Sequence, residues 1–137
     1  SNSDSLNFDI MLEEIDNVRS IYIELEYDMD VFSVDSESIT KGEAFSNCDG
    51  SLLLVNENSD QFGILKINIS FLGDSCNGFE GSGILVTVKM DALQSVMESE
   101  SLLKINHNSS FRDIDNNEIN ISNINSLEPH ISRVVFP

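Results

Sequence analysis

The sequence predicts an antiparallel β-sandwich, and three observations point to it. Apolar residues recur at every second position in several segments, as expected of strands with one buried face. Turns rich in Asn, Asp, Gly and Ser separate these segments. The chain has 137 residues, enough for one domain with a single core. We therefore expect one domain over residues 1–137, in which residues 1–4 are the end of a linker or a cloning remnant.

The clearest alternation of apolar and polar residues covers four segments, 6–12, 20–27, 62–72 and 84–90. A polar break at residues 14–17 predicts that the first two are separate strands. Shorter apolar runs predict further strands at residues 31–34, 51–55, 102–105, 111–121 and 131–136, the fourth with a turn at 115–117. Residues 51–55 and 62–72 are expected to pair as a hairpin, and residues 35–47 to form a polar corner.

One segment departs from the strand period. Ala92, Leu93, Val96 and Met97 recur at helical spacing after Asp91, which can cap a helix. We therefore expect one short helix at residues 91–100.

The charge of the chain limits its partners. Seven Lys and Arg residues stand against 24 Asp and Glu residues, which gives a formal net charge of -17. Phosphate backbones and anionic lipid surfaces would repel such a chain. No stretch approaches the ~18 apolar residues of a membrane helix. We expect no nucleic-acid partner and no membrane insertion.

Catalytic residues are not apparent. The only histidines are His107 and His130, and no serine lies in a Gly-x-Ser-x-Gly elbow. Glu13 and Glu14 are adjacent at a strand end, where successive side chains point to opposite faces. These two carboxylates cannot converge on one bond, so we predict a solvated edge there and no enzyme.

Asp113, Asp115 and Asn117 stand at alternate positions and resemble the opening of a calcium loop. An EF-hand is excluded, because Gly is absent from the sixth position and Glu from the twelfth. A turn held by hydrogen bonds from side chain to backbone is the better interpretation, which leaves these residues a weak calcium candidate. No cofactor is expected.

Cys48 and Cys76 are the only cysteines. They could form one disulfide of an exported protein if their loops meet. The alternative is two unpaired or buried thiols. No Cys-x-x-Cys motif is present, so neither interpretation implies redox chemistry.

The outward side of three predicted strands is a candidate partner-binding face. Its members are Ser20, Tyr22, Glu24, Glu26, Lys66, Asn68, Ser70, Leu72, Leu85, Thr87 and Lys89. An aromatic residue and leucines among polar side chains are typical of a protein-binding interface, with Tyr22 and Leu85 as apolar anchors. The alternative is that these are isolated apolar residues on a solvent face, which are common.

The order of five segments resembles the cohesin family. These segments are NVRSIYIELEYDMDVFSV (17–34), ITKGEAF (39–45), GILKINISFLGDS (63–75), GSGILVTVKMDA (81–92) and FRDIDNNEINI (111–121). The resemblance covers nearly the whole chain. The sequence departs from the family at Met29, where the family's turn carries Pro, and the family's first strand has no clear counterpart before Ser5.

The resemblance implies an antiparallel jelly-roll β-sandwich of eight or nine strands, secreted or on the cell surface, in a monomeric module of a larger chain. Its implied role is to bind the calcium-loaded helices of a dockerin and so hold enzymes on a scaffoldin, with the calcium on the partner. The helix expected at residues 91–100 resembles insertions in some members.

The family's dockerin face uses its third, fifth, sixth and eighth strands. Carried over by position, the third, fifth and sixth are residues 20–27, 64–72 and 84–90, which give the face named above. Ser20 and Tyr22 stand where many cohesins carry Asn and Asp, which implies a divergent specificity. The family's topology also implies that Cys48 and Cys76 lie close enough to bridge.

Two other functions stay open. A carbohydrate-binding module on a similar sandwich would need a row of exposed aromatic rings. The chain has no Trp, and Tyr22 is the only aromatic residue expected on the face. A structural spacer in a surface protein would agree with the acidic charge.

Overall fold

A computed structural model describes residues 5–34, 38–46, 48, 50–58, 63–73, 76, 78–93, 103–105, 108–119 and 133–136. Its elements are β1 (Ser5–Tyr27), β2 (Phe32–Ser33), β3 (Ile39–Lys41), the 3-10 turn η2 (Glu43–Phe45), β4 (Leu52–Asn58), β5 (Gly63–Ser70), β6 (Phe79–Ala92), β7 (Leu103–Ile105), β8 (Ser110–Asp113), β9 (Glu118–Ile119) and β10 (Arg133–Phe136). The prediction of an all-β sandwich is confirmed. Among the described residues, no helix is long and apolar enough to cross a membrane.

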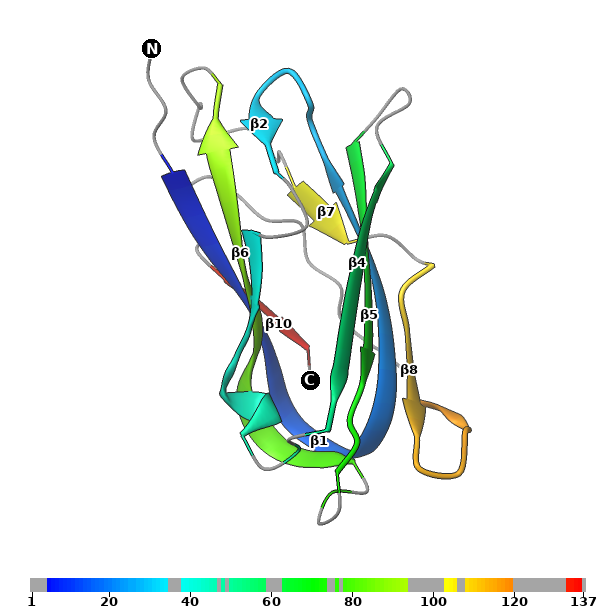
Figure 1. Ribbon diagram of the computed structural model, residues 1–137. Coiled ribbons are helices and arrows are strands. Elements are labelled where there is room, and N and C mark those ends of the chain that lie inside the picture. Colours follow the sequence, from blue (N-terminus) through cyan, green and yellow to red (C-terminus); the bar gives the residue numbers. More distant parts are fainter. Residues whose placement is uncertain are drawn as a thin grey trace.

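One curled sheet makes both layers of the sandwich, because β1 runs through each of them (Figure 1). Residues 5–12 of β1 pair with β6 and, in parallel, with β10, and β6 also pairs with β2 and β3. Residues 20–27 of β1 pair with β5, while β7 and β8 pair with residues 18–27. The predicted hairpin is confirmed, since β4 pairs antiparallel with β5.

The polar break at residues 14–17 is a bend within one strand, so the prediction of two separate strands is wrong. Glu14 and Asn17 have positive φ angles of 53° and 50°, and the pairing of β1 with β6 shifts register on both sides of Ile15. Two left-handed residues turn the strand without ending it. The bend is what carries β1 from one layer to the other.

The core lies between the two layers. The alternation predicted for residues 20–27 is confirmed, because Ile21, Ile23 and Leu25 are at most 2% exposed. The same period holds in β5, where Leu65, Ile67 and Ile69 are buried. Alternation on both strands therefore fixes which side chains point outward.

The predicted helix cannot begin at Asp91. Asp91 and Ala92 end β6, where they pair with Ser33 and Phe32 of β2, and Ala92 is buried. Strand pairing and burial decide the conformation here, against the local helical spacing. Residues 94–100 of the expected helix lie outside the described residues.

Candidate functional site

The outward residues of β8, β1, β5 and β4 stand in rows across one sheet, and together they form what we call the outer face. The first row runs from Arg112 through Ser20 and Ser70 to Leu52, and the second from Ser110 through Tyr22 and Asn68 to Leu54. The third continues from Glu24 through Lys66 to Asn56. Side chains of directly opposite residues lie next to one another on such a sheet, so these residues share one surface.

The structure brings together the residues predicted on two of the three strands. Ser20, Tyr22, Glu24, Glu26, Lys66, Asn68 and Ser70 all belong to the outer face. Most are partly or fully exposed, whereas Glu24 is only 9% exposed. Leu72 follows β5 and is partly exposed, and its backbone N–H donates to Oγ of Ser51.

The third predicted strand belongs to the opposite layer, so its assignment to this face is wrong. Thr87 and Lys89 lie on β6 and pair with Asp9 and Asn7 in the first half of β1. Thr87 donates a hydrogen bond of 2.8 Å from Oγ1 to Oδ1 of Asp9. Alternation gives the side of a strand but not its layer, which depends on pairing between distant segments.

Leu85 is fully buried, and its predicted outward position is wrong. Val86 pairs with Ile10 and Ile84 pairs with Met11, which leaves Leu85 as an extra residue of β6. Leu85 and Val86 are both 0% exposed. A bulge of this kind reverses the alternation and turns Leu85 into the core.

The sequence prediction missed two strands of the face. Leu52, Leu54 and Asn56 of β4 are exposed, as is Arg112 of β8. Leu52 and Leu54 keep 52% and 59% of their surface accessible. The continuous apolar run from Leu52 to Val55 hides the alternation of β4, although the predicted hairpin with β5 would have shown which residues point outward.

A hydrogen-bond network lies between β1 and the turn before β8. The Tyr22 hydroxyl donates to Oε2 of Glu24, and Nδ2 of Asn108 donates to Oε1 of Glu24 at 3.2 Å. The backbone N–H of Glu24 donates to Oγ of Ser109 at 3.0 Å. Burial, followed by the bond to Glu24 and its negative charge, raises the pKa of Tyr22 to about 12. The network therefore keeps Tyr22 neutral and holds its ring in place.

The weak calcium candidate has the geometry of a turn. Oδ1 of Asp113 accepts hydrogen bonds from the backbone N–H groups of Asp115 and Asn117, each at 2.9 Å. Asn116 has a positive φ of 65°, as is common for Asn at such a position. In the part of the chain that the structure describes, no three His, Cys, Asp or Glu side chains gather as a metal-binding group.

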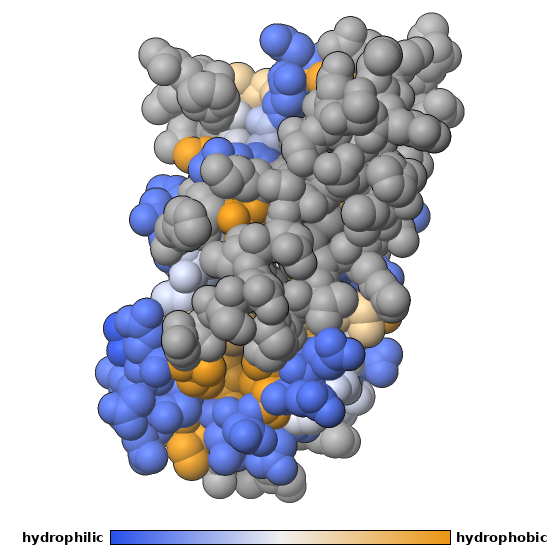
Figure 2. Space-filling view, turned by 180° about the vertical axis from the view of Figure 1, so that it is seen from behind, coloured by the Kyte–Doolittle hydropathy of each residue, from blue (hydrophilic) through white to orange (hydrophobic). Residues whose placement is uncertain are grey.

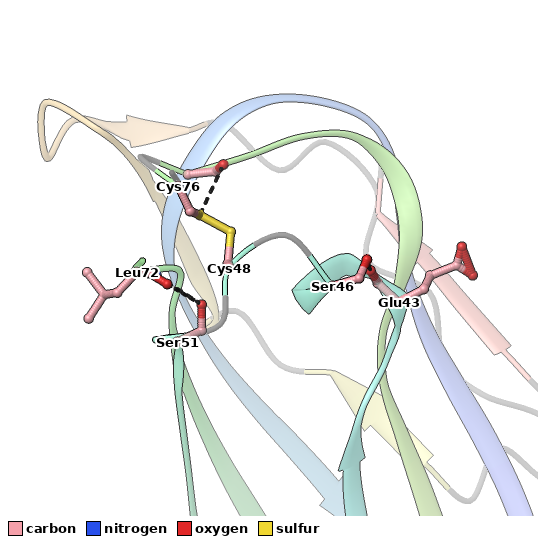
Figure 3. The surroundings of a disulfide bond; sticks show 7 residues. Glu43, Ser46, Cys48, Ser51, Leu72 and Cys76 are labelled. Atoms are coloured by element: carbon pink, nitrogen blue, oxygen red, sulfur yellow. Dashed lines mark hydrogen bonds between the residues drawn. A yellow bond between two sulfur atoms is a disulfide. The ribbon is translucent and has the colours of Figure 1, made fainter. Parts of the chain in front are cut away.

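Cys48 and Cys76 form a disulfide with a Cα–Cα distance of 5.2 Å, so the predicted bridge is confirmed. Figure 3 shows that it lies beside the contact of Ser51 with Leu72, where the start of β4 meets the end of β5. Both half-cystines are buried. The bridge therefore ties together the two loops that bound the hairpin at this end.

The bend of β1 carries a strongly acidic end. Glu13, Glu14 and Asp16 are exposed there, and Glu14 donates its backbone N–H to Oγ of Ser82. Seen from behind, hydrophilic side chains surround a smaller hydrophobic patch at the lower end of the molecule (Figure 2). This arrangement agrees with the solvated edge predicted from Glu13 and Glu14.

Comparison with known proteins decides the family. A family model described as cohesin domain matches residues 3–126. The chain belongs to the cohesin family. No curated protein matches this cohesin.

Solved structures share the fold of this cohesin at low sequence identity. The type II cohesin A11 from Bacteroides cellulosolvens is 13% identical, with a TM-score of 0.71 over 87% of this chain and 84% of that one. A type II cohesin from the cellulosome of Acetivibrio cellulolyticus is 15% identical, with a TM-score of 0.67 over 87% and 80%. The sixth cohesin of scaffoldin B from A. cellulolyticus, solved in complex with a Cel5 dockerin, is 15% identical, with a TM-score of 0.58 over 83% and 91%.

Proposed function

We propose that this cohesin is a non-catalytic protein-binding module that docks a dockerin-bearing partner on its outer face, in an extracellular multi-enzyme or cell-surface assembly. Membership of the cohesin family and the complex of a structural neighbour with a dockerin support this proposal. The observation that carries it is the outer face itself. Tyr22, Leu52 and Leu54 lie there among polar side chains, a mixture typical of protein-binding surfaces.

The remaining parts of the proposal follow from the disulfide and the charge. A buried disulfide agrees with an oxidising compartment, and hence with secretion or the cell surface. The net charge of -17 disfavours binding to nucleic acid and to anionic membranes. Calcium is expected on the dockerin, whose fold would depend on it. We expect the module to be monomeric within a larger chain.

Binding to dockerins provides the test. The probes are all the calcium-loaded dockerin modules encoded in the genome that carries this gene, and binding is measured by calorimetry. At least one dockerin should bind, and excess chelator should abolish its binding while this cohesin keeps its own melting temperature. Failure of the whole set to bind would overturn the proposal.

A pair of matched variants locates the site. Asn68 and Asn7 are both exposed asparagines within strands, but Asn68 lies on the outer face and Asn7 on the opposite layer. Asn68→Arg should weaken dockerin binding by at least about tenfold through its bulk at the centre of the face. Asn7→Arg adds the same charge and should leave binding unchanged. The reverse result would place the site on the opposite layer.

A further inference from the structure

Glu24 departs from the pattern of exposure on the outer face. Alternation directs its side chain outward, as it does for Tyr22 and Glu26, and both of those residues are partly exposed. Glu24 keeps only 9% of its surface accessible. Ionised side chains are rarely buried, because removing their charge from water has a high free-energy cost. A carboxylate in this position therefore requires compensating contacts.

The turn before β8 supplies part of this compensation. Ser109 is buried there, and its Oγ accepts a hydrogen bond of 3.0 Å from the backbone N–H of Glu24. Nδ2 of Asn108 donates to Oε1 of Glu24 at 3.2 Å. The next residue, Ser110, pairs with Tyr22 in the ladder of β8 and β1. The turn is thus fixed beside the outer face, and it holds one oxygen of the carboxylate.

The other oxygen of the carboxylate holds the ring of Tyr22. The Tyr22 hydroxyl donates its hydrogen bond to Oε2 of Glu24. A tyrosine side chain has two rotatable bonds that orient its ring, and a hydrogen bond at the far end of the ring restrains both. An aromatic side chain that is ordered before binding loses less conformational entropy when a partner packs on it. The network therefore prepares the ring for contact.

The neighbours of Tyr22 give this hydrogen bond its importance. In the second row, Tyr22 stands between Ser110 on β8 and Asn68 on β5. Both are short polar side chains, which offer an aromatic ring little apolar surface to pack against. We attribute the fixed orientation of the ring to its bond with Glu24.

We infer that Glu24 is a positioning residue of the docking surface, which holds the ring of Tyr22 in its binding orientation and does not itself contact the partner. Asn108 and Ser109 hold Glu24 in place. The inference rests on the proposed function and adds to it a largely buried residue on which affinity depends. Loss of Glu24 should weaken binding because the ring must then be ordered when the partner binds.

The test measures the affinity of folded variants for whichever dockerin of the set described above binds the wild-type module. Glu24→Ala should weaken binding by at least about fivefold, because the ring of Tyr22 is then free to reorient. Glu24→Gln should bind within about threefold of wild type, since its amide can accept from Asn108 and donate to the Tyr22 hydroxyl oxygen. Glu80→Ala is the matched control. Glu80 is an exposed glutamate within β6, outside the outer face, and this variant should bind as wild type.

A double-mutant cycle shows whether Glu24 acts through Tyr22. Tyr22→Ala alone should weaken binding by at least about tenfold, as expected of an aromatic anchor. Adding Glu24→Ala to Tyr22→Ala should then change the affinity by less than about twofold, because the ring that Glu24 holds is gone. Equal losses from Glu24→Ala in both backgrounds would mean that Glu24 contacts the partner itself, and the inference would be overturned.

The remaining results separate this inference from the proposed function. If Glu24→Ala binds like Glu80→Ala while Asn68→Arg still weakens binding, the inference is overturned and the proposed function stands. If Glu24→Gln loses as much affinity as Glu24→Ala, the charge and not the network serves binding, and the inference is again overturned. If no dockerin binds the wild-type module, both fall. Should Glu24→Ala fail to fold, Tyr22→Phe removes only the hydroxyl and takes its place: it should weaken binding by at least about threefold, and wild-type affinity would overturn the inference.

Discussion

Tyr22 donates its hydroxyl hydrogen bond to Oε2 of Glu24, two residues further along the same strand. Successive side chains of a strand alternate, so this spacing places both groups on the outer face. Asn108 closes the network from the turn before β8. A polar group in the middle of the face is thereby bonded within the molecule, and the ring above it is left for contact.

The titration of Tyr22 follows from this network. Burial and the Glu24 carboxylate raise the pKa of Tyr22 from 10.0 to about 12. Between pH 10 and about 12 the unfolded chain therefore binds fewer protons than the folded one, so stability falls as pH rises through this window and is unaffected below it. The chain has two tyrosines, so Tyr27→Phe leaves Tyr22 as the single reporter in a near-ultraviolet titration. Ionisation of Tyr22 near pH 10 in the Tyr27→Phe variant would contradict this prediction. Adding Glu24→Gln to that variant should lower the pKa of Tyr22 only part of the way back toward 10.0, because burial is the larger cause of the shift.

The turn between β8 and β9 should depend on Asp113. Asp113→Ala removes the acceptor of two backbone hydrogen bonds and is expected to reduce the free energy of unfolding by about 1–2 kcal/mol. Asp115 is exposed in the same turn, and Asp115→Ala should change it by less than about 0.5 kcal/mol. Chemical denaturation measures both. Calcium should leave the melting temperature of the isolated module unchanged, and a rise with calcium concentration would instead identify a bound ion.

Gly63 is needed for the packing of Tyr27. The two residues pair across β5 and β1, and a Cβ on Gly63 would lie 2.4 Å from the ring of Tyr27. Gly63→Ala should therefore destabilise the fold by about 1–3 kcal/mol, the usual cost of overpacking. At Gly50 the nearest atoms to a Cβ are 3.4 Å or more away, so Gly50→Ala is the matched control. Equal melting temperatures for the two variants would show that Tyr27 moves aside without cost.

The β-sandwich could be predicted because the period of a strand is local. Ile21, Ile23 and Leu25 show in the sequence alone which side of β1 is buried. The bend at Glu14 was visible as a polar break, but the sequence does not say whether such a break ends a strand or turns it. That outcome depends on β6, which follows β1 around the bend.

The outer face was only partly predictable, because its remaining errors are not local. Leu85 points inward because β6 gains one residue against β1. Residues 84–86 are all apolar, so the sequence does not show which of them is the extra residue. For Thr87, alternation predicts the correct side of the strand, but it does not show that β6 belongs to the opposite layer. The sequence does not identify Leu54 as an outward residue, because its neighbours Leu53 and Val55 are also apolar. In the structure, the side chain of Leu54 is exposed to solvent. The orientation and the layer of these three residues depend on pairing between strands that are distant in sequence, which the local pattern does not show.

The disulfide should contribute stability chiefly by restricting the unfolded chain. It joins residues 28 positions apart, and closing a loop of this length is expected to add about 3–4 kcal/mol to the free energy of unfolding. The reduced wild type and the double variant with Cys48→Ser and Cys76→Ser should each lose this amount of free energy of unfolding, as measured by chemical denaturation. The ring contacts of Phe71 with Phe45 and Phe79 in the adjoining core do not involve either cysteine, so the reduced protein should still fold. A reduced protein as stable as the oxidised one would mean that these ring contacts and the Ser51 hydrogen bond to Leu72 already hold the two loops together.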